Sequence, residues 1–321
     1  MALDFATRRF LEMMAERGRP PLHAGTPTEA RLASAAMADL AGPAPPMVRV
    51  EDHSVVSSDG GSVPMRLVVP IESPRGLIVF YHGGGWVIGS AQQSETVGRK
   101  LAERTSCAVL LVDYRLAPEH RYPIAVEDSY AALLWADANL QRIAGRRVPL
   151  MVAGDSAGGN LAAVMALRAR DQQGPALALQ VLIYPVTDAD FERASYVDPE
   201  NQLFLSRESM LWFWDHYLPD PARRLEPDAS PLHAADLSGL PPAVVLTAEH
   251  DVLRDEGEAY AQRLQQAGVA VDFKRHAGQM HGFFTVLALP GSEGGYQQVV
   301  KAVRGALAQA EQAAKKAAGA G

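Results

Sequence analysis

Short apolar runs alternate with amphipathic segments along most of the chain. Each run is typical of a strand that is buried on both faces, and the segments between the runs repeat their apolar residues at helical spacing. Because parallel strands need long crossovers, this order predicts an α/β fold with a mostly parallel sheet flanked by helices. The predicted strands are residues 76–81, 108–113, 150–153, 179–184, 243–247 and 269–274, and the predicted helices are 95–105, 126–140, 161–170, 256–267 and 296–313.

Two further strands are predicted ahead of this alternation, at residues 47–56 and 63–69. The turn between them contains Asp59-Gly60, and Asp-Gly between strands favours a hairpin. At the other end of the sheet, the strand 269–274 is expected to form an exposed edge. Such an edge is free to pair with a second copy of the chain, which would give a homodimer.

Two segments do not fit the alternation of strands and helices. Residues 5–14 carry apolar side chains at helical spacing, and a second helix is expected after the N-cap Thr26, with Pro27 at its first position. Residues 185–241 contain no predicted strand and are too long for a plain crossover. We therefore predict a helical cap over the sheet. The predicted division is cap at 1–45 and 188–238, and core at 46–187 and 239–321.

The segment Gly154-Asp155-Ser156-Ala157-Gly158 separates a predicted strand from a predicted helix. Gly-x-Ser-x-Gly in that context is the pattern of a nucleophile elbow. Such a turn holds the serine in a strained backbone conformation and projects its hydroxyl out of the sheet, while the glycines allow the strand and helix to approach. The sequence predicts Ser156 as a nucleophile. The alternative is that the segment is only a glycine-rich connection between strand and helix, in which the serine has no catalytic role.

A serine nucleophile needs a histidine base and an acid that orients the histidine. We expect His281 to be the base, because it follows the last strand by a short loop, and His276 at the end of that strand is its rival. We expect Asp251 to be the acid, because it follows the carboxyl end of a predicted strand. Asp255 is its main rival and Glu249 a weaker one.

A run of three glycines follows the predicted strand 76–81. Without side chains, the backbone N–H groups of such a run can approach an oxyanion. Gly84 and Gly85 are the leading predicted donors, with Ala157 as a third, while Gly83 either joins them or serves the turn. The alternative, a phosphate-binding loop, is disfavoured because no Gly-Lys-Ser/Thr follows.

Five residues near these motifs are predicted to contact substrate. Trp86 follows the glycine run, Asp155 precedes the nucleophile, and Tyr184 ends a predicted strand. Trp212 and Phe213 lie in the inserted segment and are expected to shape the acyl pocket. The alternative for these two aromatics is that they only pack on each other.

Composition and charge narrow the function further. The 321 residues are 48% hydrophobic and 21% charged, as in an ordinary globular protein, and the net charge of −7 without a basic cluster argues against a nucleic-acid partner. The single cysteine, Cys107, is expected to be a buried core thiol, and no metal or organic cofactor is implied. We predict a cytoplasmic protein, because neither a signal-peptide pattern nor a membrane-spanning apolar stretch is present.

Four motifs occur together in the chain: Tyr-His-Gly-Gly-Gly-Trp at 81–86, Asp-Tyr-Arg-Leu-Ala-Pro-Glu at 113–119, Gly-Asp-Ser-Ala-Gly-Gly at 154–159 and His-Gly-Phe at 281–283. Together they resemble the bacterial hormone-sensitive-lipase-like carboxylesterases of the α/β-hydrolase superfamily. The resemblance implies an α/β-hydrolase fold with a helical cap. It also implies hydrolysis of short-chain esters through an acyl-enzyme, with Ser156, Asp251 and His281 as the triad in the superfamily's chain order.

The resemblance also implies structural roles for Asp113, Arg115 and Glu119. The chain departs from the family at Val252, where a proline often follows the acid. Two other functions stay open at this point. A ligand receptor of the same fold would lack the catalytic histidine, whereas His281 is present, and an amidase or carbamate hydrolase would use the same triad.

The elbow context generates a direct prediction for the nucleophile. Ser156→Ala should lower ester hydrolysis by a factor on the order of 10⁴ or more, because the attacking oxygen is lost while the fold is retained. The measurement is kcat/KM for a nitrophenyl ester, with circular dichroism as the check on folding. Near wild-type turnover by the folded variant would remove Ser156 as the nucleophile.

Overall fold

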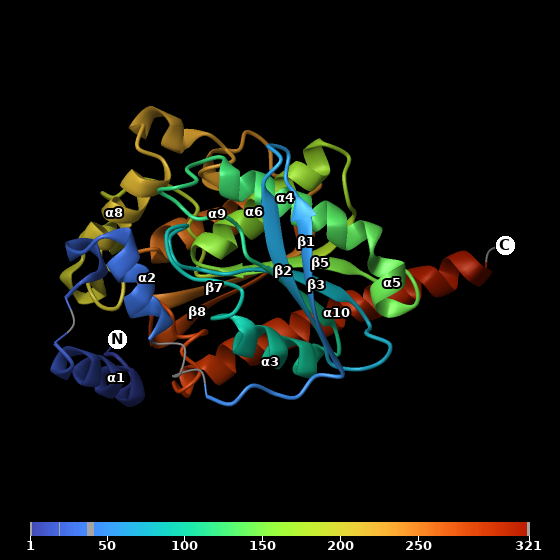
Figure 1. The fold of residues 1–321 in the computed structure, drawn as a ribbon, viewed down its shortest axis with the longest axis horizontal. Helices are drawn as coiled ribbons and strands as arrows, with labels where there is room; N and C mark the ends of the chain where they lie inside the picture. The colour runs from blue at the N-terminus through green and yellow to red at the C-terminus, as the bar shows by residue number, and fades with distance from the viewer. Residues whose placement is uncertain (1, 19, 37–41, 320–321) are drawn as a thin grey trace.

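The computed structural model describes residues 2–18, 20–36 and 42–319, so the outer ends of the predicted segments 1–45 and 239–321 lie outside the described residues. Its centre is one eight-stranded sheet with the order β1-β2-β4-β3-β5-β6-β7-β8 (Figure 1). β1 and β2 form the predicted hairpin, β2 runs antiparallel to β4, and the remaining neighbours are parallel. The predicted α/β fold is confirmed. The strands are β1 (Arg49–Val56), β2 (Ser62–Val69), β3 (Leu77–Tyr81), β4 (Ala108–Val112), β5 (Leu150–Asp155), β6 (Leu177–Ile183), β7 (Ala243–His250) and β8 (Val271–Met280).

Helices cover both faces of the sheet. On one face pack α4 (Ile124–Ala138), α5 (Leu140–Ala144), α6 (Ala157–Asp171) and α9 (Arg254–Gln266), and on the other α3 (Glu95–Thr105) and α10 (Gly291–Gly319) (Figure 1). Val79 and Tyr81 of β3 join the first of these cores, while Ile78 and Phe80 join the second. Because both sides of the central strands are buried, these strands appear in the sequence as continuous apolar runs.

The predicted cap segments lie together on one side of the molecule. α1 (Phe5–Glu16) and α2 (Pro27–Ala35) are on the same side as α8 (Arg207–Tyr217) (Figure 1). Thr26 caps α2 as predicted, because its hydroxyl accepts the N–H of Glu29 while the Glu29 carboxylate accepts the N–H of Thr26. The segment between β6 and β7 contains helices and turns but no strand, also as predicted. Its first α-helix is the short α7 (Ala194–Val197).

Several contacts join the N-terminal segment to its surroundings. His23 Nδ1 lies 3.1 Å from Ser209 Oγ of α8. Arg31 of α2 donates to the carbonyl oxygens of Val87 and Ala117, both at 2.8 Å. Its guanidinium also forms a bidentate ion pair with the Glu119 carboxylate. Glu119 thus has the structural role that the resemblance implied, since it holds the guanidinium that anchors α2 to the core.

Several element boundaries differ from the prediction, and two of them adjoin the predicted site residues. β8 continues to Met280, so His281 follows the strand directly and not after a loop. β8 is the edge of the sheet and exposes most of the residues from Asp272 to Arg275, so it lacks the apolar run that marks the central strands. α6 begins at Ala157 and not at 161, because its first turn contains glycines whose low helix propensity hid its start.

Three further expectations concern the molecule as a whole. Cys107 is a buried core thiol as predicted, and burial raises its pKa to about 11. Among the described residues, no helix has both the length and the apolar character needed to cross a bilayer. β8 lies at the edge of the sheet, and its pairing with a second copy stays a prediction.

Candidate active site

The turn between β5 and α6 has the geometry of a nucleophile elbow. Ser156 adopts φ 57° and ψ −119°, a strained combination for a residue other than glycine. Its N–H donates to Ile183 O of β6 at 2.9 Å, which ties the turn to the sheet. A Cβ on Gly158 would lie 1.9 Å from Tyr81 O, so only glycine allows α6 to pack this closely against the end of β3.

The structure brings Ser156, His281 and Asp251 together. His281 Nε2 lies 3.1 Å from Ser156 Oγ, and His281 Nδ1 lies 2.8 Å from Asp251 Oδ2. All three side chains are buried, with exposed fractions of 7%, 8% and 1% for Ser156, His281 and Asp251. With a proton on Nδ1, the imidazole donates to the carboxylate and leaves Nε2 free to accept from the serine hydroxyl. This arrangement can activate Ser156 for attack on an acyl carbon.

The rival residues lie elsewhere. His276 Nε2 is 3.0 Å from Gln298 Oε1, and its ring packs against Phe283, away from the serine. Asp255 accepts the N–H of Ser195, and Glu249 accepts the N–H of Gly278 at 2.7 Å. In these contacts the three residues hold neighbouring backbone and side chains, whereas the His281 ring contacts Asp251 and Ser156.

Of the four predicted oxyanion residues, three leave their N–H groups available. No hydrogen-bond acceptor takes the N–H of Gly84, Gly85 or Ala157 among the residues that the structure describes. Ala157 is the first residue of α6, so its N–H also carries the positive end of the helix dipole. Gly84 has φ 114°, and a Cβ there would lie 2.3 Å from Ile88 O, which explains the glycine.

The prediction of Gly83 as an oxyanion donor is wrong on its geometry. Its N–H donates to Asp155 Oδ1 at 2.9 Å, so it is not free for a ligand. The Asp155 carboxylate therefore ties the glycine run to the elbow. Asp155 is 8% exposed, and burial raises its pKa to about 6. The sequence shows that Asp155 adjoins Ser156, but it does not show which group the Asp155 carboxylate contacts.

A cavity of about 520 Å³ lies over the serine. Its floor includes Ser156, His281 and the glycine run, and its walls are mainly apolar. Of the five predicted substrate contacts, Asp155, Tyr184 and Phe213 line it. Sequence reasoning missed the wall residues Leu11, Met14, Leu203, Phe204, Leu205 and Met210, whose only signal was an apolar position within a cap segment.

The other two predicted substrate contacts, Trp86 and Trp212, do not line the cavity. Trp86 is fully buried, and its ring stacks on Tyr217 with centroids 4.1 Å apart. Trp212 packs edge-on against Phe213 and His216. The Trp86 ring therefore packs against α8 from the core. The Trp212 ring, which belongs to α8, packs against other side chains of the same helix. Packing within and beneath the cap thus decides which aromatic reaches the site.

No cluster of three or more metal-ligating side chains occurs within residues 2–18, 20–36 and 42–319. The cavity floor carries a serine hydroxyl, an imidazole and available backbone N–H groups, and a carboxylate contacts the imidazole. Acyl transfer needs a nucleophile, a base, an orienting acid and an oxyanion site, and these groups are the candidates for those roles.

Comparisons with known proteins agree with this geometry. A family profile for the alpha/beta hydrolase fold matches residues 78–285. Carboxylesterase NlhH of Mycobacterium tuberculosis is 40% identical over 243 residues, covering 74% of this chain and 76% of that protein. Ethyl acetate hydrolase of Pseudomonas putida is 36% identical over 294 residues, covering 88% and 92%. The solved hyperthermophilic esterase of the archaeon Pyrobaculum calidifontis matches with a TM-score of 0.87 and 37% identity, covering 95% and 99%.

The sheet order and the strand–serine–helix elbow define the class of the protein as an α/β hydrolase. Within that class, the chain belongs to the hormone-sensitive-lipase-like carboxylesterase family that its four motifs indicated.

The raised pKa of Asp155 predicts a pH-dependent contribution to stability. The folded state binds the Asp155 proton more tightly than the unfolded chain, so this contribution is present at low pH and is lost as the pH rises through about 6. Between pH 5 and pH 8, the wild type should lose about 1 kcal/mol of unfolding free energy relative to Asp155→Asn, which cannot titrate. Urea unfolding of both proteins at the two pH values measures the difference. Parallel pH dependences of the two proteins would show that the pKa of Asp155 is not raised.

Proposed function

We propose that this carboxylic ester hydrolase cleaves short-chain esters through Ser156, His281 and Asp251, with an acyl-enzyme intermediate. The observation that carries the proposal is the continuous contact from Ser156 Oγ through the His281 ring to Asp251, at the floor of an apolar cavity. The names of the relatives support the same reaction, since they include a carboxylesterase and an ethyl acetate hydrolase.

In the acylation step, Ser156 Oγ attacks the ester carbonyl carbon while His281 Nε2 takes the hydroxyl proton. Asp251 stabilises the imidazolium that forms. The carbonyl oxygen becomes an oxyanion, for which the N–H groups of Gly84, Gly85 and Ala157 are the available donors. The tetrahedral intermediate then expels the alkoxide, His281 passes its proton to that oxygen, and the acyl group stays on Ser156.

In the deacylation step, His281 Nε2 removes a proton from water, and the resulting hydroxide attacks the acyl carbon. The second tetrahedral intermediate uses the same oxyanion donors. Its collapse breaks the bond to Ser156 Oγ, which recovers its proton from His281, and the carboxylic acid leaves. The serine, the imidazole and the carboxylate end in the states in which they began, so no co-reactant other than water is consumed.

We also propose that residues 1–45 and 188–238 act as one cap, which sets the size of the acyl pocket. The contact of His23 with Ser209 and the pairing of the Phe10 and Phe204 rings, with centroids 6.3 Å apart, join the two segments. Both segments supply cavity walls, for example Leu11 and Met210. The core segments 46–187 and 239–321 supply the reacting groups.

The preference for short acyl chains rests on Phe213. A Cβ on Gly85 would lie 2.2 Å from the Phe213 ring, so this ring fills the space beside the oxyanion loop. A bulky side chain in that place limits the room for an acyl tail near the serine. The similarity to a protein named ethyl acetate hydrolase supports a small substrate.

Of the alternatives, a receptor without catalysis is disfavoured by His281, which is present and in contact with Ser156. Amide or carbamate hydrolysis would use the same groups, and the rates on a matched ester and anilide separate it from esterase activity.

A mechanism-based label tests the proposal. The wild type should hydrolyse nitrophenyl acetate, and an organophosphate nitrophenyl ester should inactivate it with an adduct on the peptide that contains Ser156. Ser156→Ala should take up no label, while His276→Asn should label at nearly the wild-type rate. Mass spectrometry of the digested protein locates the adduct. Ester turnover with the adduct on another residue would overturn the proposed triad.

The two neighbouring aromatics of α8 give a matched test of chain length. Phe213→Ala should shift the preference toward longer acyl chains, because Phe213 lines the cavity, whereas Trp212→Ala should leave the profile unchanged. The measurement is kcat/KM across nitrophenyl esters from acetate to decanoate. A shift in the Trp212 variant, or an unchanged profile in a folded Phe213 variant, would contradict the assigned pocket wall.

A further inference from the structure

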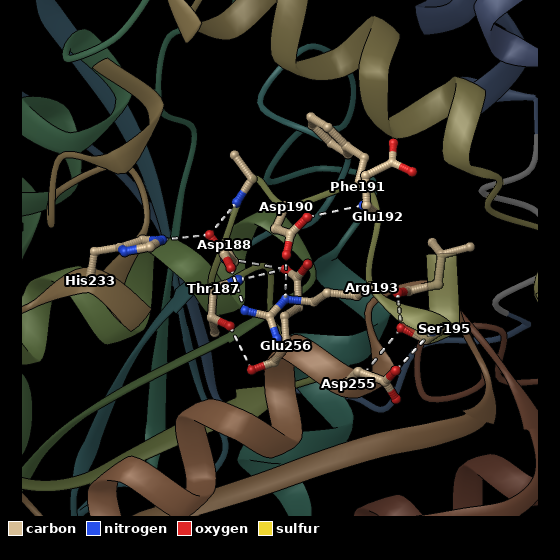
Figure 2. Close-up of polar contacts among 12 residues, drawn as sticks. Thr187, Asp188, Asp190, Phe191, Glu192, Arg193, Ser195, His233, Asp255 and Glu256 are labelled. Carbon is tan, nitrogen blue, oxygen red and sulfur yellow. Dashed lines mark hydrogen bonds and ion pairs between the residues drawn. The ribbon is translucent and has the colours of Figure 1, made fainter. Parts of the chain in front are cut away.

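A serine of the inserted segment contacts the loop that carries Asp251. Ser195 lies in α7 and is fully buried. Its N–H donates to Asp255 Oδ2 at 2.8 Å, and its hydroxyl donates to Val252 O at 2.7 Å (Figure 2 shows Ser195 and Asp255). The same hydroxyl accepts the N–H of Asp255 at 3.3 Å. Ser195 therefore joins the middle of the turn between β7 and α9 to the first turn of α9.

The carbonyl that receives the Ser195 hydroxyl belongs to the same peptide unit as the N–H of Leu253. That N–H donates to Asp251 Oδ1 at 2.9 Å. The other oxygen of this carboxylate, Oδ2, faces His281. A continuous chain of hydrogen bonds thus runs from Ser195 through one peptide group to Asp251, and on through His281 to Ser156.

We propose that Ser195 is a positioning residue for ester hydrolysis and acts through the Val252–Leu253 peptide on Asp251. The proposal rests on the proposed triad. Because a peptide unit is planar, a donor that fixes the carbonyl at one end also fixes the direction of the N–H at the other. The Ser195 hydroxyl in addition polarises the peptide, which makes the Leu253 N–H a stronger donor to the carboxylate.

Polar contacts near α7 restrain the segment that carries Ser195. Arg193, which precedes α7, pairs with the buried carboxylate of Asp188. Glu256 of α9 accepts the N–H of Thr187 at 2.8 Å, and its own carbonyl accepts the Thr187 hydroxyl at 2.8 Å (Figure 2). The exit from β6 and the start of α9 are therefore joined close to Ser195 in the chain fold, since Asp255 next to Glu256 contacts Ser195.

Glu256 lies beside the buried carboxylate of Asp188. The Glu256 carboxyl group accepts the backbone N–H groups of residues 187 and 188, and the Asp188 carboxylate accepts that of residue 189. Burial raises the pKa of Glu256 well above its usual range, which favours its neutral form in this place. The Asp188 carboxylate is in turn paired with Arg193.

The alternative is that Ser195 only stabilises the inserted segment. In that case, loss of its hydroxyl would lower stability and change kcat by the same factor whether or not Asp251 is present. A positioning role through Asp251 predicts a different result, because the hydroxyl has nothing to position once the carboxylate is gone.

The experiment is a double-mutant cycle on kcat for nitrophenyl acetate with the full chain. Ser195→Ala should lower kcat about tenfold with KM changed less than about twofold, because one hydrogen bond to the acid loop is lost. In the Asp251→Asn background, Ser195→Ala should cause no further loss. Ser195→Cys, which keeps a weak donor of similar shape, should lie between serine and alanine, and it also serves if the alanine variant does not fold.

Ser230→Ala is the matched control. Ser230 is also fully buried in the inserted segment, and its hydroxyl has no hydrogen-bond partner among the described residues. This variant should keep wild-type kcat. The thermal midpoint of each variant reports stability separately from kcat.

The outcomes separate the two proposals. If Asp251→Asn alone keeps wild-type kcat, the triad is wrong. If Asp251→Asn is severely impaired but Ser195→Ala lowers kcat equally in both backgrounds, the triad stands and the role of Ser195 is overturned. Wild-type kcat in Ser195→Ala, or an equal loss in Ser230→Ala, also overturns it.

Discussion

The close backbone approach between β3 and α6 is the constraint on which the site depends. At Gly158 the helix comes so near Tyr81 O that no side chain fits between them. This contact brings the N-terminus of α6 next to the loop that follows β3, so that Ser156, Gly84 and Gly85 line the same cavity. The proposed nucleophile Ser156 and the proposed donors Gly84 and Gly85 come from distant parts of the chain and meet because the sheet holds both segments at one edge.

Around this point, the buried carboxylates of Asp155 and Asp251 each have a backbone partner. Asp155 accepts the N–H of Gly83, and Asp251 accepts the N–H of Leu253 while facing His281. A buried carboxylate without such partners would be costly, so these bonds fix its orientation as well as satisfy it. Fixed dipoles and donors of this kind need little reorganisation when charge develops during acyl transfer.

The core and the proposed cap contribute different parts of the site. Strand ends and the segments after them carry the proposed reacting groups, whereas α1, α8 and their neighbouring turns form much of the apolar wall. The cap is also linked to the chemistry, because Ser195 in its inserted segment bonds to the loop that bears Asp251.

The sequence by itself determined the sheet, the flanking helices and the three side chains that meet at the site, because apolar runs, the elbow pattern and the loops after strands are local signals. It missed the length of β8, whose exposed residues carry no apolar run. Only the tertiary structure decided that Gly83 serves Asp155, that Phe213 and not Trp86 reaches the cavity, and that Ser195 contacts the acid loop. Each of these depends on packing between segments far apart in the chain, and such contacts leave no local pattern in the sequence.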